Sequence, residues 1–373
     1  MSDIEEPDRL LEFPHPREAT RLLGHEDQIH TLQAALASNR FPHAWIFSGP
    51  AGIGKATLAY RLARFILKHP PGSDITDISA NVPLEVPADD SVFQQVAARS
   101  HPGLKIIKRP YDNKTKRLKS EITVDEIRNL HGLFKTTTTD GGWRIALIDS
   151  ADDMNRNAAN ALLKILEEPP ENSAIILISH QSGALLPTIR SRCRMLGFKS
   201  LDEEHILQIM AEQLGPDPDP GAHERATIVR LANGSAGNAL QLASSAGLKA
   251  HENLISLLES LPQLNGAKAH EIANHLSRRD AFDEFRFFRR LLCEWLNGFV
   301  RFCTTGQGDH LPKREYDLCQ RLGTRVDLEP WLEVWEKVQQ SFIQADVLNL
   351  DKRQLLLTVF FQLETAAKQA QRS

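Results

Sequence analysis

"FSGPAGIGKATLAYRLARFIL", residues 47–67, joins a glycine-rich turn to the start of a helix. The glycines let the backbone turn its amide groups inward around phosphate oxygens, and the positive end of the helix points at the same anion. Lys55 then reaches the outer phosphates. The GxxxxGK spacing after the apolar strand "HAWIFSG" (43–49) predicts a phosphate-binding loop rather than a chance glycine-rich turn. The predicted nucleotide-binding positions are Gly49, Gly52, Ile53, Gly54, Lys55, Ala56, Thr57 and Asp149.

The loop departs from the usual ATPase pattern at Ala56, where a serine or threonine hydroxyl normally binds Mg²⁺. Thr57 is the next residue, but one step along a helix rotates a side chain by roughly 100°. Its hydroxyl is therefore expected to point away from the metal position. The loop can cradle phosphate while it lacks one metal ligand.

A second departure follows the apolar strand "WRIALID" (143–149). Asp149 stands where ATPases hold Mg²⁺ through water, but Ser150 replaces the glutamate that polarises the attacking water in many of them. Serine is no general base unaided. Asp152 and Asp153 are alternatives, but their place just before a helix favours a capping role. We expect a site that can hold ATP or ADP, without deciding between them, and that does not hydrolyse ATP efficiently.

Apolar segments and helical segments alternate in the first half of the chain, and this order predicts a parallel sheet with helices on it. The expected strands are 43–49, 104–108, 143–149 and 174–180, and the expected helices are 26–37, 55–67, "TVDEIRNLHGLF" (123–134) and "NAANALLKILEE" (157–168). Residues 68–90 are rich in proline and aspartate and are expected to form an irregular insertion. From Leu201 onward amphipathic helices dominate. The fold class is therefore α/β, followed by an all-helical second half.

The overall composition limits the kinds of partner. A chain of 373 residues suits two or three domains, and its net charge of -4 means that any contact with nucleic acid must come from a local patch. Seven Lys or Arg residues between Lys105 and Lys119 form one such patch, which is either a solvated hairpin or a contact for DNA phosphates or a partner. The four cysteines are far apart and form no CxxC pair, which argues against a disulfide framework and a zinc cluster.

The N-terminal stretch "MSDIEEPDRL" is acidic and lacks the apolar core of a secretory signal. No apolar run approaches the ~18 residues that a membrane span requires. The expectation is a cytoplasmic protein without a membrane partner.

Four segments resemble a known family. They are "LLGHEDQIHTLQAALASNRFPHAWIFSGPAGIGKATLA" (22–59), "RIALIDSADDMNRNAANALLKILEEPP" (144–170), "AIILISHQSGALLPTIRSRCRML" (174–196) and "LANGSAGNALQLA" (231–243). In this order they resemble the delta-prime subunits of the bacterial DNA polymerase III clamp loader, which are AAA+ proteins. The strings "NALLKILEEPP" and "TIRSRC" are the most specific.

This resemblance implies three domains. They are a RecA-like AAA+ nucleotide-binding domain at 1–200 with the insertion 68–90, a helical lid at 201–247, and a helical collar at 248–373 that assembles a five-membered ring. The resemblance also implies a task, which is to help load the sliding clamp onto primed DNA together with delta and gamma/tau subunits. Such a subunit is part of the DNA polymerase III holoenzyme, a DNA-directed DNA polymerase.

Arg192 in "TIRSRC" matches the arginine that the family presents to the ATP of a neighbouring subunit, so the resemblance implies a catalytic arginine finger acting in trans. Without the resemblance, an arginine-rich turn after a strand would be taken as a solvated or salt-bridged edge. Cys193 beside it is most simply a small packing residue.

Two departures from the family concern nucleotide and metal. Asn238 stands where hydrolysing relatives carry an arginine that senses the γ-phosphate, which is a third loss beside Ala56 and Ser150. Many relatives carry a cysteine-rich zinc module where this chain has the cysteine-free segment 68–90. These departures predict a non-hydrolysing subunit without zinc or another metal.

Two other classes of protein are alternatives. An ATP-hydrolysing subunit of gamma/tau type needs the hydroxyl and the carboxylate that this chain lacks. An initiator-like DNA binder needs a C-terminal helix-turn-helix, whereas "DEFRFFRRLLCEWLNGFVRF" (283–302) and "WLEVWEKVQQSF" (331–342) show aromatic and leucine stripes suited to helix-on-helix packing.

Overall fold

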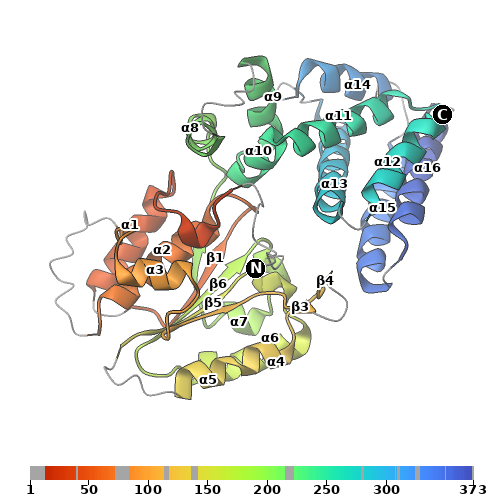
Figure 1. The fold of residues 1–373 in the computed structure, drawn as a ribbon. Helices are drawn as coiled ribbons and strands as arrows, with labels where there is room; N and C mark the ends of the chain where they lie inside the picture. The colour runs from red at the N-terminus through yellow and green to blue at the C-terminus, as the bar shows by residue number, and fades with distance from the viewer. Residues whose placement is uncertain are drawn as a thin grey trace. The chain divides into compact units, whose positions relative to one another are not determined.

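The computed structural model divides the chain into two compact units, which are described separately (Figure 1). Unit 1 comprises Met1–Asp217 and Asn233–Asn238, and unit 2 comprises Pro218–Ala232 and Ala239–Ser373. The structure describes residues 13–38, 41–71, 84–112, 117–135, 142–214, 222–278, 281–306, 308, 311–323, 328–348 and 350–371. The short segment 233–238 thus belongs with the N-terminal unit although its chain neighbours do not.

A five-stranded parallel sheet forms the centre of unit 1, in the order β2-β5-β6-β1-β7. Its strands are β1 (Ala44–Ser48), β2 (Leu104–Ile107), β5 (Arg144–Ile148), β6 (Ser173–Ser179) and β7 (Arg194–Gly197). All seven residues of β6 are buried, as expected for a central strand of a parallel sheet that is covered on both faces. The predicted α/β class and parallel pairing are confirmed.

Helices cover both faces of this sheet, because successive strand residues point to opposite sides. Trp45 and Phe47 of β1 pack in the cluster that contains the buried residues of α1 and α2. Ala44 and Ile46 face the other cluster, which contains the buried residues of α4 and α6. Figure 1 shows α1, α2 and α3 on one face and α4 to α7 on the other. These helices are α1 (Glu26–Ala37), α2 (Lys55–Lys68), α3 (Ser91–Ala97), α4 (Val124–Arg128), α5 (Leu130–Lys135), α6 (Arg156–Glu167) and α7 (Pro187–Arg190).

Several local features differ from the sequence-based expectation. The helix expected at 123–134 is interrupted at Asn129, so that α4 and α5 are two short helices. The edge strand β7 was not predicted, because three of its four residues are exposed and the segment has no apolar run. In the basic segment, where a hairpin was one of the two alternatives, β3 (Tyr111–Asp112) pairs antiparallel with β4 (Arg117–Leu118). Most of the insertion 68–90 falls outside the described residues, and its place outside the sheet stays a prediction.

The described residues of the C-terminal unit form helices and the connections between them, without a strand. After α8 (Glu203–Leu214) of unit 1, the helices are α9 (Ala222–Ala232), α10 (Ala236–Ala243), α11 (Ser245–Glu259), α12 (Gly266–Leu276), α13 (Phe282–Thr305), α14 (Lys313–Gly323), α15 (Glu329–Leu348) and α16 (Lys352–Ala370). Aromatic rings pack α13 against α15, since the Phe299 ring of α13 lies 4.7 Å from the Trp331 ring of α15. Within α13, Phe299 also stacks on Trp295 at 5.1 Å. The predicted helix-on-helix use of these stripes is confirmed.

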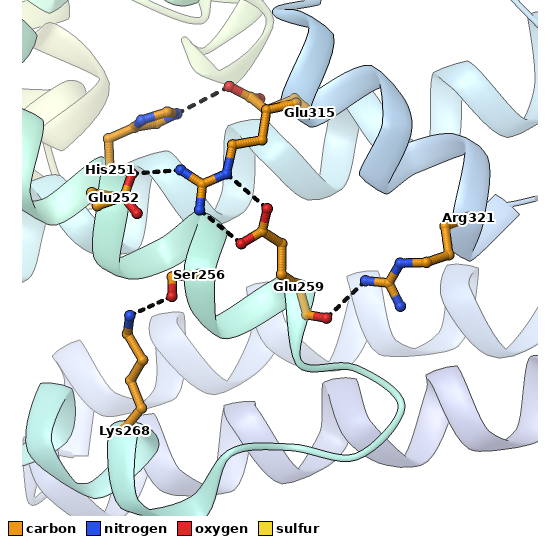
Figure 2. A network of polar contacts seen from close by, with 8 residues as sticks. His251, Glu252, Ser256, Glu259, Lys268, Glu315 and Arg321 are labelled. Carbon is orange, nitrogen blue, oxygen red and sulfur yellow. Dashed lines mark hydrogen bonds and ion pairs between the residues drawn. The ribbon is translucent and has the colours of Figure 1, made fainter.

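A network of charged side chains fastens α11 to α14 in unit 2 (Figure 2). Arg314 donates to both carboxylate oxygens of Glu259 at 2.7 Å and to Glu252 at 2.7 Å. These hydrogen bonds from Arg314 hold the pKa of Glu259 below its usual range. Arg321 donates to the carbonyls of Glu259 and Leu261 at the C-terminal end of α11, where unsatisfied carbonyls attract a cation.

Candidate nucleotide-binding site

The glycine-rich loop connects β1 to α2 at the carboxyl edge of the sheet, as predicted. Gly52 and Gly54 have positive φ values of 72° and 102°, which favour glycine. A Cβ atom on Gly52 would lie 2.5 Å from the Oγ of Ser235, so the loop approaches its neighbour closely there. Ile53 is buried, and its carbonyl oxygen lies 2.6 Å from Nε2 of His25. The loop is therefore fixed in its turn by its own glycines and by neighbouring residues.

Lys55 is only 3% exposed and is bound to its own loop. Its ammonium donates to the carbonyl of Gly49 at 2.7 Å and to that of Pro50, and it lies 3.1 Å from Nδ1 of His180. Burial lowers the pKa of Lys55 to about 8, although the negative charges of Asp149 and Asp152 favour the ammonium form. Phosphate must displace these loop contacts before it binds the ammonium.

His180 is a member of this site that sequence reasoning missed. It directly follows β6, whose carboxyl end lies at the same sheet edge as the loop, and Nε2 of its ring is 3.3 Å from Oγ of Ser150. The residue is exposed overall, but burial of the ring and then the charge of Lys55 lower the pKa of His180 to about 4. The imidazole is therefore neutral at pH 7. A polar residue that ends an apolar run beside the loop strand was the available signal.

The contacts of His180 determine what Ser150 can do. A charged Lys55 can only donate, so Nδ1 of the neutral imidazole accepts and Nε2 carries the proton. Nε2 then donates to Ser150 and has no lone pair to take a proton from it. Ser150 lies in the left-handed region at φ 56°. Nothing in this contact activates the serine as a base or a nucleophile.

The aspartates after β5 have roles other than the predicted helix cap. Asp152 accepts from the Ser179 hydroxyl at 2.7 Å and from the backbone N–H groups of His180 and Gln181. Asp153 pairs with Arg109 at 3.1 Å. The capping prediction was wrong, because Asp152 and Asp153 lie within a 3-10 turn, Ala151–Asp153, and the start of α6 is capped by Asn155. Asp152 instead ties the loop after β5 to the end of β6.

Asp149 and the loop helix have the positions expected of them. Asp149 directly follows β5 and is 5% exposed, and its backbone N–H donates to the Ile107 carbonyl at 2.8 Å. Ala56 is half-buried and packs against the apolar core between the sheet and α2. Thr57 is half-buried too. The loop, Lys55 and Asp149 thus come together, and the metal-binding hydroxyl is missing from position 56.

The segment 233–238 lies against the phosphate loop. The Ser235 hydroxyl donates to the Ala51 carbonyl at 2.9 Å, and the Gly237 N–H donates to the Gly52 carbonyl at 2.8 Å. The backbone N–H of Asn238 donates to the Ser235 hydroxyl at 3.2 Å. Asn238 is therefore near the loop, as the resemblance implied, and offers no cation there.

Arg192 is away from this site. It precedes β7, and β7 runs parallel to β1, so Arg192 is at the amino edge of the sheet whereas the phosphate loop is at the carboxyl edge. The residue is exposed and donates from Nη1 to the Thr188 carbonyl at 3.0 Å. Burial raises the pKa of the neighbouring Cys193 thiol to about 12, and Cys193 packs against the apolar core. The inert packing role predicted for this cysteine fits its surroundings.

The basic segment 105–119 is partly described. Arg109 is engaged with Asp153, and the backbone N–H of Ile122 donates to the Asp153 carbonyl at 2.8 Å. Lys114 and Lys116 lie outside the described residues. The choice between a solvated hairpin and a phosphate contact therefore stays open.

Two features are absent from the described residues, a metal-binding cluster and a membrane-spanning helix. Among these residues, no group of three or more His, Cys, Asp and Glu side chains is placed to hold a metal ion. None of the helices in the described ranges is long and apolar enough to cross a membrane. The expectation that the chain holds no metal stays a prediction.

The parallel sheet, the glycine-rich loop and the helical C-terminal part are those of a P-loop α/β protein. A family described as "DNA polymerase III, delta subunit" matches residues 24–202. The DNA polymerase III subunit delta' of Pseudomonas aeruginosa is 31% identical over 329 residues, which cover 86% of this chain and 91% of that protein. This chain belongs to the delta' family of DNA polymerase III clamp-loader subunits.

More distant similarities extend to other subunits. The DNA polymerase III subunit tau of Bacillus subtilis is 30% identical over 237 residues, which cover 62% of this chain and 38% of that protein. A solved structure of a DNA polymerase III gamma subunit-related protein from Thermotoga maritima has a TM-score of 0.41 and 17% identity, and the match covers 91% of this chain and 100% of that one.

Proposed function

We propose that this chain is a non-hydrolysing delta-prime subunit, which helps the clamp loader place the sliding clamp on primed DNA. Membership of the delta' family supports the assembly, and the composition of the nucleotide site carries the finer statement. The site combines a complete phosphate loop with Ala56 in place of the metal-binding hydroxyl and Ser150 in place of the water-activating carboxylate.

The contacts in the site support the absence of turnover. The neutral His180 donates to Ser150 and does not deprotonate it, and Asp152 is engaged with the end of β6. Neither residue supplies a base for the attacking water. The loop can still hold the phosphates of ATP or ADP once Lys55 leaves its carbonyl partners.

The place of Arg192 supports a role in trans. It is exposed at the amino edge of the sheet, on the opposite side from the phosphate loop of its own chain. A phosphate that it contacts therefore belongs to another subunit. An arginine suits this task, because its planar fork keeps its charge and spans two phosphate oxygens, and fingers of this kind contribute about 10³–10⁵-fold in other phosphoryl-transfer systems.

The proposed assembly is a five-membered ring with delta and gamma/tau subunits. In this proposal 1–200 is the nucleotide-binding domain, 201–247 the lid, and 248–373 the collar through which the ring assembles. The helix packing of α11 to α16 is compatible with a collar.

Reconstitution tests the proposal. Tagged chain is mixed with delta, gamma/tau, the clamp and primed DNA, and assembly and ATPase activity are measured for the wild type and for Arg192→Ala. We expect Arg192→Ala to assemble normally and to depress ATPase activity at the adjacent site. Failure of the wild type to assemble contradicts the role as a loader subunit. Mg²⁺-dependent turnover of about 1 s⁻¹ or more by the isolated chain favours the gamma/tau-type alternative.

A further inference from the structure

Glu167 forms an ion pair with Arg192 at the amino edge of the sheet. The distance from Nη2 of Arg192 to Oε1 of Glu167 is 2.8 Å, and the two side chains are 36% and 50% exposed. Nη1 of the same guanidinium donates to the Thr188 carbonyl at 3.0 Å and lies 3.5 Å from the Ser191 hydroxyl. The guanidinium is thus held from two sides by groups of its own chain.

The pair joins two segments that both end at this edge. Glu167 is the last residue of α6, which leads into β6, and Arg192 lies between α7 and β7. The nearby charged residues Glu168 and Arg190 take no part in this pair. In the described part of the chain, Glu168 and Arg190 are exposed and make no side-chain hydrogen bond or ion pair. The fold therefore pairs Glu167, and not Glu168, with Arg192, and not with Arg190.

The contacts leave part of the guanidinium available. Arginine carries five N–H donors, and the three contacts involve only Nη1 and Nη2. The remaining donors can reach an anion from another molecule while Glu167 and Thr188 keep the fork in place. A side chain that is already held loses less rotamer freedom when it binds, which is the general benefit of preorganisation.

We propose that Glu167 is a positioning residue, which orients Arg192 for contact with the nucleotide phosphate of a neighbouring subunit. This inference rests on the proposed function, since it assigns a partner to the finger. Glu167 itself does not contact the phosphate. It acts by holding the guanidinium, so its loss lowers the rate of the phosphoryl transfer and leaves the affinity of the neighbouring site for ATP unchanged.

The test uses a reconstituted loader in which only the ATP site adjacent to Arg192 is competent. The variants are Glu167→Gln, Arg192→Ala, their double variant, and Glu168→Gln as the matched control. We expect Glu167→Gln to lower kcat at that site roughly twofold to fivefold with KM unchanged, as suits one exposed ion pair. Glu168→Gln should match the wild type. In the Arg192→Ala background, Glu167→Gln should have no further effect.

A second measurement follows the pair in the isolated chain, without any partner. The ¹⁵Nε–¹Hε signal of Arg192, assigned by its loss in Arg192→Ala, should report a more mobile guanidinium in Glu167→Gln than in the wild type or Glu168→Gln. An unchanged signal overturns the inference, and so does a kcat of Glu167→Gln that equals or exceeds that of the control. If Arg192→Ala itself leaves hydrolysis unchanged, the proposed finger fails, which is a different outcome.

Discussion

The ammonium of Lys55 lies 3.1 Å from Nδ1 of His180, a residue 125 positions further along the chain. This contact places the phosphate-loop lysine between its own loop carbonyls and the end of β6. In the described structure the Lys55 ammonium, which would bind the outer phosphates, thus already has hydrogen-bond partners within the chain. Nucleotide binding must exchange these contacts for phosphate oxygens.

The buried lysine makes stability depend on pH. The pKa of Lys55 is about 8 in the folded chain, whereas the ordinary value for lysine is 10.5. Between pH 8 and pH 10.5 the unfolded state therefore binds more protons than the folded state. Stability therefore rises with pH in that window, by up to ~3 kcal/mol for this group. Urea unfolding at pH 7.5 and pH 10 should show this rise for the wild type and not for Lys55→Met. Parallel pH profiles of the two chains would contradict it.

A hydroxyl at position 56 should make nucleotide binding depend more strongly on Mg²⁺ without giving the chain ATPase activity. Ala56→Thr puts a potential Mg²⁺ ligand at the start of α2, while Ser150 still offers no base for water. We expect calorimetry to show tighter nucleotide binding with Mg²⁺ than without it in Ala56→Thr, and a smaller difference in the wild type. Turnover should stay at background in both. A gain of turnover in this variant would show that the carboxylate is not required.

The carboxylate of Asp152 should contribute more to stability than that of Asp153. Asp152→Ala leaves the Ser179 hydroxyl, which is in a fully buried residue, without its acceptor at 2.7 Å. An unmet buried group costs about 1–3 kcal/mol. Asp153→Ala removes a partly exposed ion pair, which costs about 0–1 kcal/mol. Equal losses in denaturant unfolding would argue against the tie between the β5 loop and β6.

Gly52 should not tolerate a side chain. Gly52→Ala places a Cβ at φ 72° and 2.5 Å from the Ser235 hydroxyl, so the substitution adds backbone strain and a steric conflict. A strained residue of this kind costs about 1–3 kcal/mol. Gly183→Ala is the control, because a Cβ there has no atom within 4 Å. Hydrogen exchange should show faster opening of segment 233–238 in Gly52→Ala alone.

The pair between Glu259 and Arg314 should stabilise unit 2 in a pH-dependent way. Hydrogen bonds from Arg314 hold the pKa of Glu259 below its ordinary value of 4.5. The contribution is therefore complete above that value and is lost as pH falls through the lower, folded-state pKa. Glu259→Gln should destabilise the chain at pH 7, by about 1 kcal/mol or less because the pair is exposed, and should match the wild type in acid. A difference that persists in acid would mean that the charge is not responsible.

Most of the fold could be predicted from local patterns. The run 174–180 became the fully buried β6, and the glycine loop followed by amphipathic 55–67 became the turn and α2. Apolar periodicity and glycine spacing indicate burial and turns within a short stretch of sequence. Such elements can therefore be predicted without a structure. Edge strand β7 and the helix interruption at Asn129 could not be predicted from the sequence, because neither has a distinctive local pattern.

The chemistry that is missing from the nucleotide site follows from residue identity alone, since neither Ala56 nor Ser150 carries the required functional group in any conformation. Which side chains contact one another depends on the tertiary fold. In the fold His180 contacts Lys55, and Glu167 pairs with Arg192. Asp152 binds the end of β6 and does not cap a helix. These contacts join residues from separate segments, and parallel pairing sets which strand ends share an edge. The side-chain identities are local, but their partners follow from the order of strands in the sheet.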